Sequence, residues 1–457
     1  MLIGKLFKES GERMKKKIAI FMTAFMLLGF SSSSFATTTQ VDALIEKLVD
    51  KGILTRSEGI KLKGEIAADA DTLAKETMKK ELPEWVQKMK LKGDFRLRYQ
   101  YERKDGDADA RERGRIRYRL GLETEIVKDV KVAAGLATGP NVNNTNGSTG
   151  SDPRSTNQSF TDTFEHPSIQ LDYGYAEWQA YKTDNDLVKL IGGVHPRPDY
   201  LWNPTDLLWD SDINPQGGAF HAEHKFNDQL TAYVNGGVWV IDENTNTTTY
   251  DRADSYMDFG QGGIKFQKGK LSTNIAGIYY GFNALKQTCP DWSGATNTGI
   301  TTVSNSACTA GSLRYDYDAV GGSAEIAYAK PFDFPFEEVA IFGDYIENVD
   351  GWSDGIDMVD QSIGWAIGAR LGDKKVNGKK QWQLKYIYAT LGKDAWPDFL
   401  PDSDRYGGKT DIKSHEGIIE IGLLKNVTFA LDYYQSRRMK TTKAPEHVIQ
   451  ADINFKF

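Results

Sequence analysis

From residue 89 to the end of the chain, apolar and polar residues alternate in segments of roughly ten residues. In the first segment Leu91, Phe95 and Leu97 would lie on one face of an extended strand and Arg96 and Arg98 on the other. Successive side chains of a strand point to opposite faces, so this pattern predicts a sheet with one apolar face and one polar face. The last segment, VIQADINFKF, alternates in the same way and ends on an apolar aromatic residue.

Alternation by itself fits both a soluble β-sandwich and a transmembrane β-barrel, since each has one dry and one wet face. The connections between segments separate the two folds. Short joins near Asp129, Asn227, Lys268 and Lys425 alternate with long polar stretches, as in a barrel whose two ends differ. A tilted strand of roughly ten residues crosses the apolar band of about 25 Å of an outer membrane. The mean hydropathy of −0.50 agrees with a wide barrel whose inner face meets water.

We therefore predict an all-β fold over residues 89–457, a transmembrane antiparallel β-barrel of about 16 strands. A barrel has to close, because an open sheet edge in lipid would leave backbone groups without hydrogen bonds. Aromatic side chains favour the two membrane interfaces. Candidates for these girdles are Tyr99, Tyr101, Trp178, Tyr280, Tyr328, Trp382 and Tyr388.

The N-terminal residues 1–36 have the pattern of a signal peptide. Three lysines, Lys15–Lys17, precede the apolar run IAIFMTAFMLLGF, and Ser34 and Ala36 supply the small residues of a cleavage site. Met14 could serve as the start, and a buried N-terminal helix is the alternative interpretation. The pattern predicts export through the inner membrane to the cell outer membrane.

Residues 37–88 show a helical period instead of a strand period. Leu44, Ile45 and Leu48 recur at helical spacing, and Thr55 with Glu58 has the spacing of a capping box for a second helix. We predict two short periplasmic helices. Their apolar stripe would either pair with other copies in a coiled coil or pack on the neighbouring helix, and both alternatives remain open.

Arginine is concentrated on the polar face of the first two predicted strands. The six residues are Arg96, Arg98, Arg113, Arg115, Arg117 and Arg119. In a barrel their side chains would point into the lumen, and the hairpin would make them one basic wall. Like charges at this spacing need water, counter-ions or carboxylates to screen them.

Five segments resemble the "putative porin" family of Gram-negative outer membranes. They are LKGDFRLRYQYE, RERGRIRYRLGLE, GLATGPN, SDPRSTNQSF and DLLWDSDINPQGGAF, and the resemblance runs from about Val41 to Phe457. It implies a channel with a periplasmic helical prefix but gives no solute and no site residues. Analogy with porins of this size implies a homotrimer.

In porins the third long loop commonly folds into the barrel. Here that loop runs from His195 to Gly218 and carries Asp206, Asp210 and Asp212. Our interpretation is that these carboxylates face the basic wall across the narrowest section and tune ion preference. The alternative is that the arginines are ordinary solvated lumen residues, or pair with Glu123, Glu125 and neighbouring strands.

The remaining signals are weak. Cys289 and Cys308, the two cysteines of the chain, could form a disulfide in an oxidising periplasm or remain free thiols. The Asp-x-Asp-x-Asp rhythm at residues 105–109 lacks the glycine and the bidentate glutamate of a calcium loop, so we expect an acidic surface loop. His221 and His224 would lie on opposite faces of a strand. We do not expect the protein to be an enzyme or to bind a metal ion or a cofactor. Its net charge of −7 argues against nucleic acid as a partner.

These observations favour a water-filled channel for passive diffusion of small hydrophilic solutes and ions, with outer-membrane lipid as its surroundings. One alternative is a substrate-specific anion channel for phosphate or organic acids, in which the arginine wall is a dedicated site. A more distant one is a structural or adhesive outer-membrane protein tethered by the N-terminal helices.

Overall fold

A computed structural model describes eleven parts of the chain. They are residues 44–65, 82–104, 109–139, 152–160, 164, 166–243, 253–285, 317–331, 336–350, 361–439 and 444–457. The chain forms two compact units, Met1–Gln87 and Lys88–Phe457, and we treat each by itself. Among the described residues, no helix has both the length and the apolar character needed to cross a membrane.

The described part of the first unit is helical, as predicted. Residues 44–50 and 56–65 are helices, and α4 covers Glu84–Gln87. The capping box forms, since the Thr55 backbone N–H donates to Glu58 at 2.8 Å and the Glu58 N–H donates to Thr55 Oγ1 at 3.3 Å. The predicted signal peptide (residues 1–36), Cys289 and Cys308 lie outside the described residues, as does most of the 105–109 loop.

The second unit is a closed antiparallel barrel of 16 long strands, as predicted, with the two-residue β4 added beside β2. Its connections alternate between short turns at one end and long loops at the other. The strands are β1 (Lys90–Arg103), β2 (Arg111–Val127), β3 (Val130–Gly139), β4 (Gln158–Ser159), β5 (Ser168–Lys182), β6 (Asp186–Val194), β7 (Gln216–Asn227), β8 (Leu230–Asp242), β9 (Ser255–Lys268), β10 (Leu271–Asn283), β11 (Asp318–Ala329), β12 (Glu338–Asn348), β13 (Ile363–Gly372), β14 (Trp382–Leu391), β15 (Ile412–Leu424), β16 (Val427–Arg438) and β17 (Glu446–Lys456).

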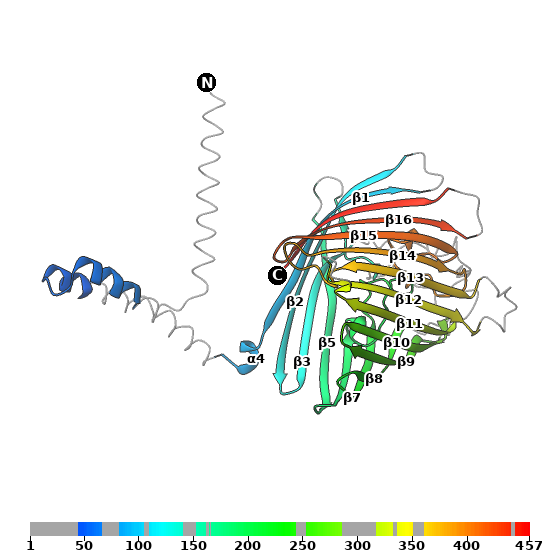
Figure 1. The fold of residues 1–457 in the computed structure, drawn as a ribbon, viewed down its shortest axis with the longest axis horizontal. Coiled ribbons are helices and arrows are strands. Elements are labelled where there is room, and N and C mark those ends of the chain that lie inside the picture. The colour runs from blue at the N-terminus through cyan, green and yellow to red at the C-terminus, as the bar shows by residue number, and fades with distance from the viewer. Residues whose placement is uncertain are drawn as a thin grey trace, which may run out of the picture. The chain divides into compact units, whose positions relative to one another are not determined.

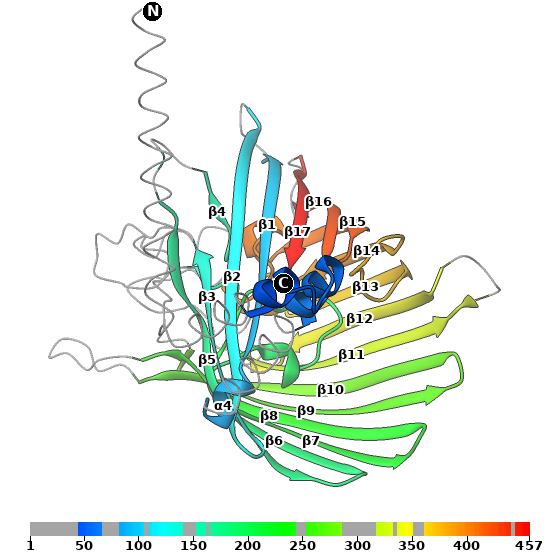
Figure 2. The ribbon, with the colours of Figure 1, turned by 90° about the vertical axis from the view of Figure 1, so that its left-hand side faces the viewer.

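The barrel closes between its first and last strands. β1 and β17, drawn in blue and red in Figure 1, pair along their length, with Arg98 opposite Asp452. Figure 2 shows the same two strands side by side from another direction. At the short-turn end the Phe457 backbone N–H donates to Gly93 O at 3.0 Å, and the Gly93 N–H donates to Phe457 O at 2.9 Å. Phe457, the residue directly after β17, therefore continues the pairing of the closing strand with β1.

The outer face of the barrel is apolar and exposed, as expected for a face that meets lipid. Val234, Ile264 and Ile275 are each more than half exposed. The girdle assignment is wrong for Tyr280, which is fully buried inside the barrel, while its neighbour Tyr279 points outward and is 44% exposed. Either tyrosine fits a two-residue period, and only the register of β10 decides between them.

Candidate functional site

The inner face of β1 and β2 carries the predicted basic wall, which we call the arginine wall. Its six members are Arg96, Arg98, Arg113, Arg115, Arg117 and Arg119. The hairpin register sets Arg96 opposite Arg117 and Arg98 opposite Arg115. Leu97, between two of them, is 40% exposed on the outer face, whereas Arg98 is 8% exposed inside the barrel. The strand period therefore directs the guanidinium groups toward the lumen, where the sequence placed them.

Carboxylates on β1 and on β17, the closing strand, neutralise part of the charge of this wall. Asp94 accepts from Arg117 Nε at 2.9 Å and from Arg119 Nε at 2.7 Å. Asp452 on β17 accepts two bonds of 2.8 Å from Arg98, a bidentate geometry that orients the guanidinium plane. Glu123 and Glu125, the partners suggested by the sequence, instead lie beside lysines: Glu123 Oε2 is 2.8 Å from Lys92 Nζ and Glu125 Oε1 is 3.4 Å from Lys88 Nζ.

The loop after β6, residues 195–215, folds into the barrel and is called loop L3 here. It includes the short 3₁₀ helix η2 (Arg197–Asp199). Gln261 on β9 accepts from the Trp202 backbone N–H at 2.9 Å and donates to Trp202 O at 2.8 Å. The Tyr200 hydroxyl donates to Glu177 on β5 at 2.8 Å. The inner surface of the barrel thus satisfies polar groups that a buried loop would otherwise leave unpaired.

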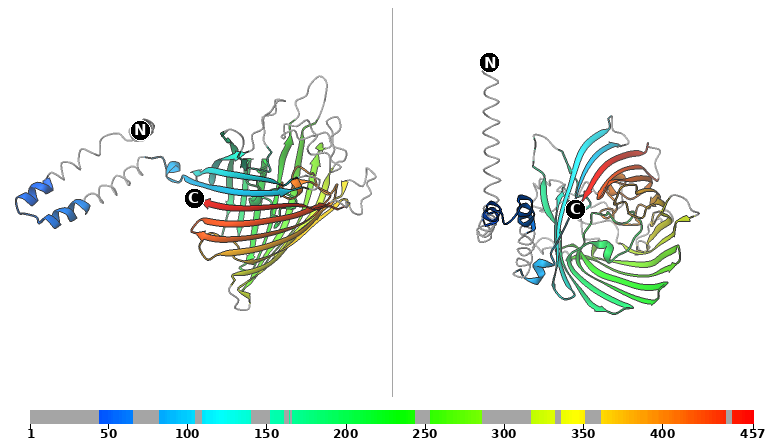
Figure 3. Two further views of the ribbon diagram at one scale, coloured as in Figure 1. Left: turned by 90° about the horizontal axis from the view of Figure 1, so that it is seen from above. Right: turned by 60° about the vertical axis from the view of Figure 1, so that its left-hand side comes forward.

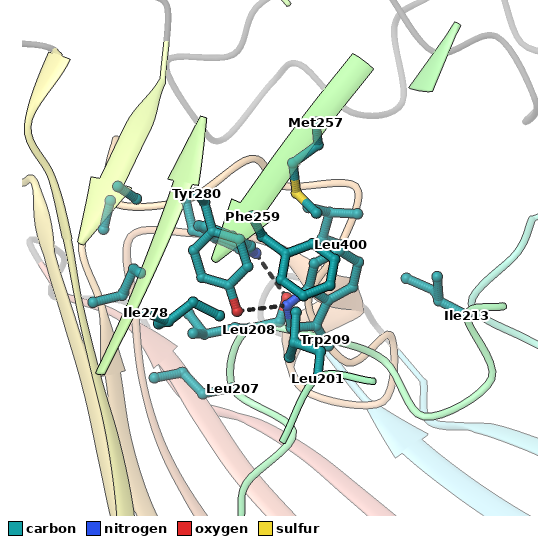
Figure 4. Close-up of a cluster of buried hydrophobic side chains, with 14 of the residues drawn as sticks. Leu201, Leu207, Leu208, Trp209, Ile213, Met257, Phe259, Ile278, Tyr280 and Leu400 are labelled. Atoms are coloured by element: carbon teal, nitrogen blue, oxygen red, sulfur yellow. Dashed lines mark hydrogen bonds between the residues drawn. The ribbon is translucent and has the colours of Figure 1, made fainter. Parts of the chain in front are cut away.

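Loop L3 is also held by an apolar cluster inside the barrel (Figure 4). Trp209 of L3 packs edge-to-face on Trp239 of β8 at 5.7 Å and on Trp396 at 5.9 Å between ring centroids. Its indole N–H donates to the Tyr280 hydroxyl at 3.3 Å. The inner faces of β8–β10 are therefore partly apolar, contrary to the simple expectation that every inward residue is wetted. Sequence alternation missed this, because the buried aromatic residues lie in segments where both faces are apolar.

Trp396 belongs to a second inward-folded loop, residues 392–411 between β14 and β15, which we call loop L7. Its indole N–H donates to Leu208 O at 2.7 Å, and the Asp210 backbone N–H donates to Leu400 O, also at 2.7 Å. L3 and L7 consequently form one folded body inside the ring of strands, which the right panel of Figure 3 views from one end. The sequence marked L7 only as a long polar stretch, although its segment AWPDFL carried an apolar signal.

The three predicted carboxylates of L3 occupy different positions. Asp212 lies beside the arginine wall, with its Oδ1 3.9 Å from Arg117 Nη1 and 3.7 Å from Arg119 Nη1. Asp206 Oδ1 lies 2.8 Å from Arg405 Nη2 of L7. Asp210 accepts from the Ser403 backbone N–H at 2.8 Å. Two of the three therefore join the loops together, and Asp212 is the one within ion-pair distance of the wall.

L7 supplies charged residues that the sequence did not single out. Arg405 is 2% exposed and bonds to Glu416 of β15 as well as to Asp206. Asp404 Oδ2 accepts from Arg98 Nη1 at 3.1 Å and so connects L7 to the wall. The inward period of β15 could have indicated Glu416, but no local pattern connects it with a loop arginine.

Burial and neighbouring charges shift the pKa values of these loop carboxyls in opposite directions. Burial alone would raise the pKa of Asp212, but Arg117, Arg119 and the Thr156 N–H hold it below its ordinary value. For Asp402, burial and then the adjacent carboxylates Asp206 and Asp404 raise the pKa well above its ordinary value. The arginines beside L3 therefore favour the charged form of Asp212, whereas burial and neighbouring carboxylates disfavour the charged form of Asp402.

A cavity of about 380 Å³ lies where these elements meet. The arginine wall contributes Arg96, Arg98 and Arg117, and the loops contribute Asp206, Asp210, Asp212, Asp402 and Asp404. β14–β17 complete it with Lys385, Glu416, Asp432, Tyr434 and Gln450. Both signs of charge thus line one cavity. Within the described part of the chain, no group of three or more His, Cys, Asp or Glu side chains could hold a metal ion.

A closed barrel with an apolar exterior and a charged interior defines the class of β-barrel channel proteins. The chain matches the family model described as "putative porin" over residues 60–111, 104–311 and 313–457, and it belongs to that family. No protein of curated function matches it by sequence.

Similar solved structures are outer-membrane porins. OprB of Pseudomonas putida is 12% identical, with 81% of this chain and 94% of that chain covered and a TM-score of 0.49. OmpF of Salmonella typhi in complex with daunomycin is 10% identical, with 81% and 97% covered and a TM-score of 0.44. A triple mutant of the Rhodopseudomonas blastica porin is 10% identical, with 81% and 100% covered and a TM-score of 0.38. At these values the site has to be argued from this chain's own residues.

Proposed function

We propose that this porin-family protein forms a water-filled channel in the outer membrane for passive diffusion of small hydrophilic solutes and ions. The arginine wall faces the acidic loops L3 and L7 across the narrowest part of the lumen. Fixed charges of opposite sign across a narrow passage set the preference for anions or cations, as rings of charge do in other pores.

The proposal rests on one observation, the position of Asp212 opposite Arg117 and Arg119 on the wall of the cavity of about 380 Å³. Because an acidic loop lies inside the barrel, we favour an ion-selective constriction over a lumen whose arginines are simply solvated. The wall is also not purely a dedicated anion site, since seven carboxylates line the same cavity.

Reversing charge in the wall tests the proposal. The double substitution Arg115→Glu with Arg117→Glu should lower the anion-to-cation permeability ratio, because it replaces two positive charges beside the passage by negative ones. An effect of about 1–2 kcal/mol on ion passage corresponds to roughly fivefold to thirtyfold in the ratio. Reversal potentials of the purified protein in planar bilayers under a KCl gradient measure it.

The matched control makes the same change of charge at the rim. Arg103→Glu with Arg111→Glu alters the same two strands, at residues that are exposed at the long-loop end. Water and salt screen charges there, so the ratio should hardly change. If the wall variant also leaves the ratio unchanged, the arginines only line the lumen.

A further inference from the structure

The cavity lined by L3, L7, β1, β2 and β14–β17 carries charged side chains of both signs. Cations come from β1 and β2 at Arg96, Arg98 and Arg117, and from L3 at Arg197. On the other side, β15, β16 and L7 contribute Glu416, Asp432 and Asp402. We call these arginines the basic side of the cavity and Glu416, Asp432 and Asp402 its acidic side, although Asp212 of L3 and Asp404 of L7 also lie beside the arginines.

On the basic side, two arginines are incompletely compensated. The nearest carboxylate of Arg96 is Asp452, with Oδ2 3.6 Å from Nη1, and that carboxylate is already held bidentately by Arg98. Arg197 is 6% exposed, and in the described part of the chain it forms no ion pair; its Nη1 donates to Asn203 Oδ1 at 3.2 Å and its guanidinium group lies over the Trp209 ring. The Nε atoms of Arg96 and Arg197 are both buried without a hydrogen-bond partner. Buried guanidinium groups in this state have bonds left to give.

On the acidic side, the same is true of two carboxylates. Asp402 is 8% exposed and accepts from the Asp404 backbone N–H at 3.0 Å through Oδ1, while its Oδ2 has no partner. Asp432 of β16 has a buried Oδ1 without a partner. Lys385, the cation of this sector besides Arg405, lies 3.8 Å from Glu416 and pairs with neither aspartate. Gln450 of β17, which also lines the cavity, is 1% exposed and lies beside Asp404.

We propose that this cavity is a binding site for small zwitterions, molecules that carry one carboxylate and one ammonium group, such as free α-amino acids. The carboxylate binds at Arg96 and Arg197, and the ammonium group binds at Asp402 and Asp432. The inference deepens the proposed channel function and rests on it, since it names the class of solute that the passage retains.

A solute with a single charge would not fit the cavity as well. Phosphate or a simple organic acid could bind the two arginines, but it would leave Asp402 and Asp432 without a counter-charge and close to a second anion. A simple cation could bind the two aspartates, but it would leave the arginines without a counter-charge and close to a second cation. A zwitterion satisfies both sides at once, and buried charges are stable only when they are paired and hydrogen-bonded. The cavity volume of about 380 Å³ lies within the range of small-molecule sites, roughly 300–1,000 Å³.

The test uses three solutes of similar size that differ in charge. Norvaline is a zwitterion at pH 7, pentanoate is norvaline without its ammonium group, and butylamine is norvaline without its carboxylate. Each is added to single channels of the full-length protein in planar bilayers at about 0.1 M KCl, where electrostatic screening is moderate. We expect norvaline to reduce the ionic current saturably, with a half-effect concentration at least tenfold below those of pentanoate and butylamine.

Two variants, each with a control, test the two sides separately. Asp402→Asn should remove most of the advantage of norvaline over pentanoate, and Arg197→Gln should remove most of its advantage over butylamine. Asp184→Asn, in an exposed turn at the short-turn end, and Arg103→Gln, at the exposed rim, make the same changes of charge outside the cavity. Circular dichroism and heat-modifiable migration in electrophoresis verify that each variant folds.

The outcomes separate this inference from the proposed function. Equal or stronger block by pentanoate would overturn the zwitterion site in favour of an anion site, and equal block by butylamine would overturn it in favour of a cation site. Ion conduction with wall-dependent selectivity but no saturable block would overturn the inference alone. A protein that inserts in the bilayer and conducts no ions would overturn the channel function and the inference with it.

Discussion

Replacing Arg405 by methionine should detach loops L3 and L7 from the barrel wall. The Arg405 side chain is 2% exposed and contacts Asp206, Glu416 and the hydroxyl of Ser414. Without it, Asp206 loses its ion pair in the interior, and Glu416 keeps only Lys385, whose Nζ lies 3.8 Å from Oε1. Removal of one partner from a buried ion pair typically costs about 3–5 kcal/mol, most of it the penalty of the charge left behind.

The expected result has two measurable parts. The unfolding midpoint in denaturant should fall by an amount equivalent to about 3 kcal/mol or more. Single-channel conductance should rise and become noisier, because L3 and L7 would fill the lumen less firmly. Both parts follow from one cause, so a large loss of stability with an unchanged conductance would contradict the role of Arg405 as the tie between the loops.

Two further variants identify the cause. Arg438→Met is the matched control, since Arg438 is 35% exposed and its Nη2 lies 3.0 Å from Asp411. An exposed ion pair contributes about 0–1 kcal/mol, so the control should lose little. Adding Glu416→Gln to Arg405→Met should restore part of the stability, because it removes one of the two carboxylates that lose Arg405. Further loss in the double variant would mean that Arg405 acts through packing.

Arginine on the outer face of β10 should be far more damaging than arginine on its inner face. Ile275 is 54% exposed and lies between Ile264 of β9 and Ala324 of β11, so it faces lipid in a membrane barrel. A cationic side chain on the lipid face costs about 2–4 kcal/mol at the middle of the bilayer. Ile275→Arg should therefore reduce stability by an amount of this order.

The adjacent residue provides the matched control. Asn274 points inward, lies opposite Lys265 and Glu325, and borders a cavity of about 410 Å³. Asn274→Arg forfeits the hydrogen bond from the Tyr233 hydroxyl, worth about 1 kcal/mol, but keeps its charge in water beside Glu325. Equilibrium unfolding from lipid vesicles compares the two. Similar losses would mean that the apolar face of β10 does not meet lipid.

The sequence was most informative where one strand alone decides the outcome. The two-residue period predicts an inward direction for Arg96 and Arg98 and an outward direction for Leu97, and in the barrel Arg98 is 8% exposed and Leu97 is 40% exposed. The alternation of short and long joins predicted the 16 strands for a similar reason, because neighbouring strands are linked by local hairpins. The error at Tyr280 fits the same account. Tyr279 and Tyr280 are adjacent aromatic residues, so the two-residue period allows either of them to face lipid. The pairing of β10 with β9 places Tyr279 on the outer face.

The positions of the side chains in loops L3 and L7 depend on long-range contacts that no local sequence pattern encodes. Asp206, Asp210 and Asp212 share one short acidic segment, yet one faces the arginine wall and the other two bind L7. The sequence also gave no reason to connect Leu208 with Trp396, which lie 188 positions apart.

The sequence by itself determined which strand residues face lipid and which face the lumen, because the direction of a side chain on a strand depends only on backbone geometry. Only the tertiary structure decided which carboxylates meet the arginines and how L3 and L7 fill the lumen. Those interactions form between residues brought together by barrel closure, such as Arg98 and Asp452, which are 354 positions apart. The energy of each depends on burial and on every neighbouring charge, and both exist only once the ring of strands has closed.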